Sequence, residues 1–346
     1  MYLKKKNKDF QTLGNQIKRL SLKYKLDIKD KAMVEKYLLY HNYFDIINGL
    51  EDLFLNKNEK DKPKNFEGYS FDDFVIFYDI NVDLRTFGLK TIAEFETKLR
   101  SLIAYYFNEV LYRTNDSDYD VLAYIDVNNF LNPAQGNELE EIRKKFDLLK
   151  NKQNVPNKYS HLVDFNSPLS VRLYKNCYMM EKMSKRNLFH DFDIPPFWVA
   201  IKEFDFGDLI KFLSLCKDGV LNRVKSEMGF SDFTRLEFIA ALFAIKNLRN
   251  HMAHAQMLNR FHNTTTYNFE NSIKIVNNFR ENGESISVFN IFKLISKAVE
   301  IKSLNNSLHQ IKSLISDQHL ETNSIEFLKS MGNEKIDEWF DLLSNE

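Results

Sequence analysis

Proline is scarce in this chain, and its distribution constrains the possible fold more than any other feature. The 346 residues contain six prolines, and none of them lies beyond Pro196. Proline disrupts helix interiors because it lacks a backbone N–H group and clashes with the preceding turn. The ten glycines are also few for a protein built from many short strands and tight turns. We therefore predict an all-α fold.

Apolar residues recur at helical spacing along the chain. One predicted helical face contains Ile92, Phe95, Leu99, Leu102, Ile103 and Tyr106. Spacings of three and four residues place such side chains on one side of a helix, where they can pack against a core. Residues 236–245 are instead apolar in almost every direction. That pattern is typical of a helix in the middle of a core.

Polar segments divide the predicted helices into three regions. Residues 1–60 are predicted to form a basic N-terminal helical region, residues 69–270 a helical core, and residues 271–346 a C-terminal helical region. A polar stretch near residues 132–168, which contains three prolines, is predicted to be an insertion in the core. The first and last regions would then be extensions of a central helical bundle.

The bulk composition excludes several classes of protein. Basic and acidic residues balance at 48 each, so the net charge indicates no particular partner. The two cysteines form neither a disulfide framework nor a zinc-binding spacing. No apolar run approaches the ~20 residues of a membrane span, and the first residues lack the pattern of a signal peptide. We predict a cytoplasmic protein with no membrane segment, no metal site and no cofactor.

A cluster of polar residues, Arg249-Asn250-His251-Met252-Ala253-His254, directly follows the buried apolar run. Polar groups in such a position must be hydrogen-bonded, exposed in a cleft or placed against another chain. Arginine carries a permanent charge and a fork of donors that suits phosphate, whereas histidine can give or take a proton near neutral pH. Those two groups are the ones needed to cleave RNA without a metal ion. Arg249, Asn250 and His254 are therefore candidate catalytic residues.

Residues 248–260, which contain this cluster, resemble the signature of the abortive-infection AbiD/AbiF family, whose members carry the HEPN ribonuclease motif Arg-x4–6-His. The similarity runs from about residue 10 to about residue 265. It includes Asn42-Tyr43-Phe44, Asp83-Leu84-Arg85 with the later Glu96, and Ile194-Pro195-Pro196-Phe197-Trp198-Val199-Ala200 followed by Phe206-Gly207. The chain departs from many members at Leu258, where they have an aromatic residue. The departure leaves the arginine, asparagine and histidine of the motif in place.

The resemblance implies a HEPN-type helical bundle and a metal-independent endoribonuclease that acts in phage defence. The ribose 2′-hydroxyl would attack the adjacent phosphorus, which leaves a 2′,3′-cyclic phosphate and a 5′-hydroxyl. His254 would act as general base or acid, and Arg249 would stabilise the charge of the transition state. Asn250 would orient His254 from one helical turn away. The resemblance further implies a toxic activity that a small bound RNA restrains.

The spacing of Arg249 and His254 predicts a homodimer. At about 100° per residue, five residues separate two side chains by roughly 140° around an unbroken helix. One helix therefore aims both groups poorly at a single phosphate, unless the helix begins or bends there. Two motifs that face each other across a two-fold axis solve this problem, since the histidine of one chain can lie beside the arginine of the other. The resemblance implies the same paired arrangement.

Several other residues are candidates for contact with RNA. His251 lies within the motif, and Asn259 and Arg260 follow it, where they either bind phosphate or cap the helix. In residues 1–36, eleven lysines and arginines outnumber four acidic residues. This segment either binds RNA phosphates or presents a solvated basic face. Its candidate residues are Lys4, Lys5, Lys6, Lys18 and Arg19.

Other interpretations stay open on the sequence alone. The chain could be a non-catalytic RNA-binding protein, or a helical adaptor that senses a phage component. A metal hydrolase could use His251 and His254, although no carboxylate lies between Asn250 and Arg260 to complete the site. Arg249 could form a structural ion pair or cap helix carbonyls. Trp198 is predicted to be a packing anchor rather than a platform for stacked bases.

Overall fold

The computed structural model describes residues 10–55, 64–114, 124, 129–131, 197–263 and 286–343. Within these ranges the secondary structure is helical, with two isolated β-bridges and no strand. The prediction of an all-α fold is therefore confirmed for the described residues. Two predicted features, the insertion near 132–168 and the basic residues Lys4, Lys5 and Lys6, lie outside them.

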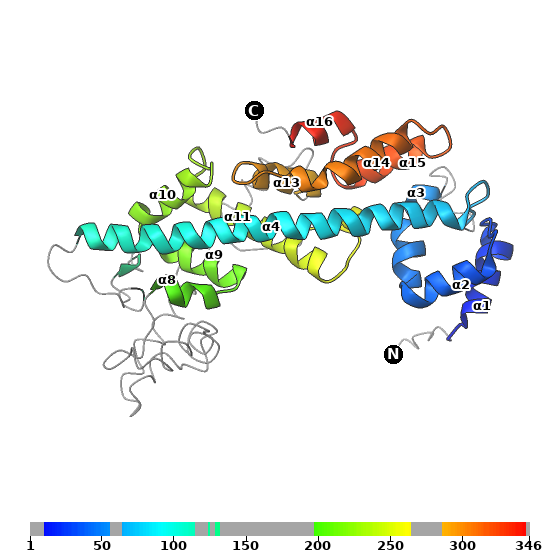
Figure 1. Cartoon of the computed structure of the whole chain (residues 1–346), viewed down its shortest axis with the longest axis horizontal. Helices are drawn as coiled ribbons and strands as arrows, with labels where there is room; N and C mark the ends of the chain where they lie inside the picture. The colour runs from blue at the N-terminus through cyan, green and yellow to red at the C-terminus, as the bar shows by residue number, and fades with distance from the viewer. Residues whose placement is uncertain are drawn as a thin grey trace, which may run out of the picture.

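A single long helix, α4 (Phe71–Thr114), runs along the length of the molecule (Figure 1). Its 44 residues span about 66 Å at the usual rise of an α-helix. The predicted apolar face is confirmed, because Ile92, Phe95, Leu99 and Ile103 are all buried. Asp73 in the first turn accepts a hydrogen bond of 2.7 Å from the backbone N–H of Ser70, which caps the start of the helix.

The N-terminal helices lie at the end where α4 begins (Figure 1). They are α1 (Leu13–Lys18), the π-helical turn η1 (Arg19–Lys23), α2 (Lys31–Tyr40), the π-helical turn η2 (Phe44–Asn48) and α3 (Gly49–Phe54). Phe54 at the end of α3 stacks on Phe74 of α4, with their ring centroids 4.0 Å apart. Such aromatic burial holds this part of the chain against the long helix.

Helices from the middle of the chain cover the other half of α4 (Figure 1). These are α8 (Phe197–Ala200), the 3-10 turn η8 (Ile201–Glu203), α9 (Phe206–Leu215) and α10 (Asp218–Glu227). Phe197 is fully buried and stacks on Phe212 at 4.7 Å, whereas Trp198 is 48% exposed. The prediction that Trp198 is the packing anchor of this segment is therefore wrong. A one-residue step along a helix turns the side chain by about 100°, and here Phe197 faces the core.

The motif lies at the end of α11 (Arg235–Ala253), which begins with a capping box between Thr234 and Glu237. This helix packs against α4, α9 and the C-terminal helix α13 (Val288–Ser296). The remaining C-terminal elements are η10 (Lys302–Leu304), α14 (Asn305–Ile315), α15 (Glu321–Ser330) and α16 (Ile336–Asp341). One hydrophobic core connects all of these helices, and the division into three regions stays a prediction.

The hydrophobic residues of this fold are used for packing between helices. In the part of the chain that the structure describes, every helix is too short or too polar to cross a bilayer. Even α11, whose middle is apolar in all directions, is enclosed by other helices of the same chain.

Candidate functional site

The motif helix α11 ends within the motif. Its last helical residue is Ala253, and the C-cap is His254. Ala255 then adopts a left-handed conformation with φ of 58°. The backbone N–H of Gln256 donates to the carbonyl of His251 at 3.2 Å, and that of Ala255 donates to Met252 at 3.0 Å. These two bonds form a Schellman motif, so His254 lies at a sharp turn and not on a continuous helix.

The left-handed residue in this turn is energetically unusual. Glycine normally occupies such a position, because a side chain on a left-handed residue costs roughly 1–2 kcal/mol. Here the residue is Ala255. The guanidinium of Arg85, on α4, donates a hydrogen bond of 2.6 Å to the Ala255 carbonyl. The strained residue Ala255 is therefore in direct contact with α4, a helix far from it in the sequence.

Three residues on one side of α4 support the turn. Asn81, Arg85 and Gly88 are four and three residues apart, so they face the same direction. Asn81 is completely buried and accepts a hydrogen bond of 2.7 Å from the backbone N–H of Leu258. Gly88 leaves room for Met252, since a Cβ atom added at Gly88 would lie 2.8 Å from the Met252 methyl group.

The three predicted catalytic residues lie at the surface of the protein. Arg249 and His254 are exposed, and Asn250 is partly exposed. Arg249 donates a hydrogen bond of 3.3 Å to the side-chain oxygen of Asn250. The backbone carbonyl of Asn250 accepts from the N–H of His254 at 3.0 Å. The side chains of Arg249 and His254 are thus accessible to solvent and to a second molecule.

A hollow of about 370 Å³ forms beside the turn. It brings together predicted site residues and others that the sequence did not single out. Arg249 is not part of its lining. The lining residues are Asn247, Asn250, His251, His254, Gln256, Arg260, Phe261 and His262. They supply imidazole, amide and guanidinium groups and no carboxylate, which suits a negatively charged ligand.

Sequence reasoning missed Asn247, Gln256 and His262, because single polar residues near a helix end carry no pattern of their own.

The metal-hydrolase interpretation would need a third ligand beside His251 and His254. Among the described residues, no group of three or more His, Cys, Asp or Glu is arranged to hold a metal ion.

His251 is a part-buried residue of the hollow. Its Nε2 lies 2.8 Å from the backbone carbonyl of Met257. A carbonyl can only accept, so Nε2 carries the proton when the ring is neutral. The ring also packs edge-on against Phe261 at 5.2 Å. Burial lowers the pKa of His251 below its ordinary value, and the nearby His262 and Arg85 lower it further.

The lowered pKa of His251 predicts that the protein loses stability in mild acid. Above about pH 6.5 the ring is neutral in the folded and unfolded chains alike. As the pH falls below that value, the unfolded chain takes up the proton first, so the free energy of unfolding decreases until the folded-state pKa is reached. We expect this free energy, measured by urea unfolding at about pH 7.5 and about pH 5.5, to fall more for the wild type than for His251→Gln. Equal losses would contradict the assignment.

Asn259 and Arg260 connect the motif to the N-terminal helices. The Asn259 amide donates to the Gly49 carbonyl at 2.9 Å. The Arg260 guanidinium donates to the carbonyls of Gly49 and Asn48, at 3.0 and 2.9 Å, and forms an ion pair with Asp52. These contacts are made with η2 and α3 and not with the end of α11, so they are not a cap on the motif helix. Phosphate binding by Asn259 and Arg260 stays a prediction, and Arg260 also lines the hollow.

Lys18 and Arg19 lie on the first N-terminal helices and are exposed. Arg19 donates to the hydroxyl of Tyr24 at 2.9 Å, and its guanidinium lies 5.2 Å from the centroid of the Tyr24 ring. Neither Lys18 nor Arg19 lines the hollow.

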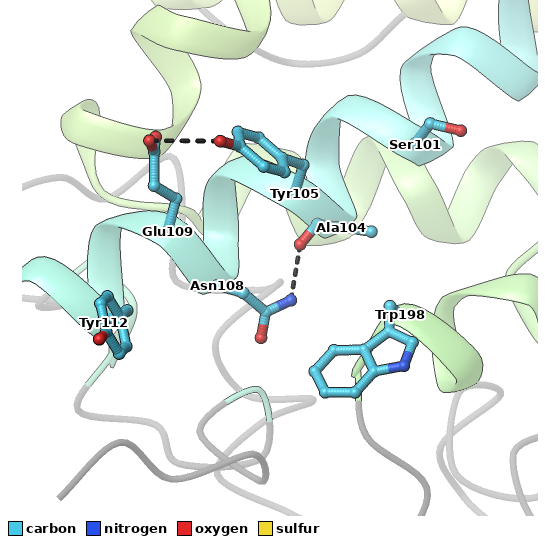
Figure 2. A pocket seen from close by; sticks show the side chains of 7 residues that line it. All are labelled: Ser101, Ala104, Tyr105, Asn108, Glu109, Tyr112 and Trp198. Carbon is cyan, nitrogen blue, oxygen red and sulfur yellow. Dashed lines mark hydrogen bonds between the residues drawn. The ribbon is translucent and has the colours of Figure 1, made fainter.

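A second hollow of about 500 Å³ lies between the C-terminal part of α4 and α8 (Figure 2). Figure 2 shows Trp198 on the opposite side of this hollow from Tyr105, Asn108 and Tyr112. The Asn108 amide donates to the carbonyl of Ala104 within its own helix. Arg85 and Tyr105 are separated by about 30 Å along α4. This hollow is therefore remote from the motif and brings no reactive pair together.

Comparison with known protein families finds a match that spans the residues described above. A family model described as Abi-like protein matches residues 36–260. The matched range begins within α2 and ends at Arg260, so it contains α4, the whole of α11 and the turn that follows. It covers well over half of the chain. Neither the search of curated proteins nor the search of solved structures finds a match.

Proposed function

The chain belongs to the Abi-like protein family, which indicates a role in abortive-infection phage defence, and we propose that it acts there as a metal-independent HEPN endoribonuclease. The observation that carries this proposal is the exposure of Arg249 and His254 at the end of a buried helix. Within the described residues, Arg249 forms no ion pair with a carboxylate and donates a hydrogen bond to the Asn250 amide oxygen. Its guanidinium is therefore available to a phosphate.

The proposed reaction needs one proton acceptor, one proton donor and one positive charge. The ribose 2′-hydroxyl attacks phosphorus and loses its proton to an imidazole, for which we assign His254. The bond from phosphorus to the 5′-oxygen breaks, and that oxygen takes up a proton from the imidazolium form of His254, which leaves a 2′,3′-cyclic phosphate and a 5′-hydroxyl. Arg249 holds the non-bridging oxygens, where negative charge grows in the transition state. The hydrogen bond from Arg249 to Asn250 orients the guanidinium.

The proposed active form is a homodimer in which two motifs share a cleft. Arg249 is on the helix and does not line the hollow, whereas His254 is on the turn and does. A second copy that brings its own Arg249 to this hollow would complete the site around one phosphate. Since both residues are exposed in one chain, such pairing needs no rearrangement of the core.

We further propose that the RNA contacts extend beyond the catalytic pair. His251 lines the hollow, and the exposed Lys18 and Arg19 add positive charge on the N-terminal helices. Contacts of this kind attract phosphates without reading sequence, and they weaken as salt is added. A small regulatory RNA held by this basic surface would restrain the nuclease in the cytoplasm.

The test of this function is cleavage of RNA by the purified protein in the presence of EDTA. We expect a labelled single-stranded RNA to yield fragments with 2′,3′-cyclic phosphate ends. Mass spectrometry of the ends distinguishes these from the 3′-hydroxyl ends that most metal-dependent nucleases leave. RNA that stays intact while it remains bound would instead support a non-catalytic RNA-binding protein. Activity that EDTA abolishes and zinc or manganese restores would support a metal hydrolase.

A helical adaptor is distinguished in cells that carry the protein and meet phage. If Arg249→Ala and His254→Ala leave both phage protection and toxicity unchanged, the adaptor function is correct and the nuclease proposal is wrong. Purification of the native protein and identification of any RNA that accompanies it would test the proposed restraint.

A further inference from the structure

Arg85 stands out among the residues around the motif, because it contacts the turn without lining the hollow. Its guanidinium donates to the Ala255 carbonyl at 2.6 Å, across 170 positions of sequence. This contact joins the middle of α4 to the first residue after the proposed catalytic histidine.

Ala255 needs external support in its left-handed conformation. With φ of 58° it occupies a region that residues other than glycine adopt only when the surrounding structure imposes it. The turn's own hydrogen bonds are of ordinary length, with Gln256 to His251 at 3.2 Å. The bond from Arg85 is shorter and charge-assisted, a class that is roughly twice as strong as neutral hydrogen bonds.

We propose that Arg85 is a positioning residue that holds Ala255 in the left-handed conformation and thereby fixes the orientation of His254. The proposal rests on the ribonuclease function proposed above. His254 and Ala255 share a peptide bond, so a change of backbone angle at Ala255 redirects the chain next to the imidazole. A displacement of about 1 Å in a catalytic group can lower the rate about 100-fold.

Asn81 also contacts the chain near the turn, but it differs from Arg85 in its burial. Asn81, one turn before Arg85 on the same side of α4, is completely buried and bonds to the backbone of Leu258. Replacing Asn81 would remove a partner from the core and risk the fold itself. Arg85 is only partly buried, so its removal leaves the packing of α4 and α11 in place. This difference makes Arg85 the residue on which positioning can be tested.

The experiment compares four variants by steady-state kinetics of RNA cleavage. Arg85→Ala should lower kcat about 100-fold with little change in KM, because geometry and not RNA affinity is lost. Ala255→Gly alone should stay within a few-fold of wild type, since glycine adopts left-handed angles without strain. The double variant Arg85→Ala/Ala255→Gly should recover most of the lost kcat. Lys90→Ala, which removes a charge from an exposed position of α4, is the matched control and should behave as wild type.

The rescue separates positioning from direct contact with RNA. Glycine at position 255 restores the turn but cannot replace a lost guanidinium, so no recovery in the double variant would overturn the proposal. A raised KM with unchanged kcat in Arg85→Ala would also overturn it, because that result indicates phosphate binding. The glycine rescue is therefore the decisive comparison.

A second measurement does not depend on nuclease activity. Hydrogen exchange of the peptide that contains residues 252–258, followed by mass spectrometry, should become about tenfold faster in Arg85→Ala and return toward wild type in the double variant. If this holds while the wild type cuts no RNA, the turn is held as proposed and the ribonuclease function fails. If the wild type cuts RNA and Arg85→Ala changes neither exchange nor kcat, the ribonuclease function stands and the positioning role is wrong.

Discussion

His254→Ala is expected to lower the rate of RNA cleavage by about 10²–10⁴-fold, the usual contribution of a positioned acid or base. Arg249→Ala is expected to lower it by about 10²–10³-fold, because a donor aimed at the charge of the transition state is lost. Both residues are exposed, so the substitutions remove chemistry and leave the core intact. Single-turnover cleavage of an end-labelled RNA, with RNA binding measured in parallel, gives both rates and affinities.

The matched control for these variants is His309→Ala. His309 is an exposed histidine on α14 that lies outside the hollow and packs against Phe340. Surface substitutions of this kind usually change stability by no more than about 0.5 kcal/mol. We expect His309→Ala to cleave RNA at the wild-type rate. Wild-type cleavage by His254→Ala or Arg249→Ala, with thermal unfolding unchanged, would show that the proposed catalytic pair is wrong.

Two inactive chains are expected to form an active dimer when each supplies the residue that the other lacks. If the arginine of one chain serves the histidine of the other, a dimer of Arg249→Ala with His254→Ala contains one intact site and one doubly defective site. Heterodimers isolated with two different affinity tags should therefore show about half of the wild-type activity. Each variant paired with itself should show almost none.

The reciprocal pairing provides the control. A chain that carries both Arg249→Ala and His254→Ala, paired with a wild-type chain, has one defect in each shared site and should be nearly inactive. Sites contained within single chains would give the opposite results: half activity for this pairing and none for the complementary one. Full activity in a monomer, measured after size-exclusion chromatography at low concentration, would also contradict the shared site.

Local sequence pattern was sufficient to predict the helical class of the fold. The apolar face of Ile92, Phe95, Leu99 and Ile103 is buried as its spacing indicated, because that spacing repeats over many turns of one helix. The family relationship was also recognisable from sequence, and the matched range ends at the residue where the motif block ends. Such features depend on residues close together in the chain.

The same reasoning failed for Trp198. Its size suggested an anchor in the core, but Phe197 takes that place and Trp198 is half exposed. Two adjacent aromatic residues point about 100° apart on a helix, and only the neighbouring elements decide which of them faces inward. The contacts of Arg260 with Gly49 and Asn48 could likewise not be predicted, because these residues lie 211 and 212 positions earlier in the chain.

The sequence by itself determined that this protein is helical, that it belongs with the Abi-like proteins, and which arginine and histidine are its candidate reactive groups. The tertiary structure alone decided that α11 stops at Ala253, that His254 lies on a strained turn, and that Arg85 and Asn81 hold this turn. These last contacts join residues 170 and 177 positions apart. A local pattern cannot encode them, because their partners meet only after the long helix and the motif helix have packed together.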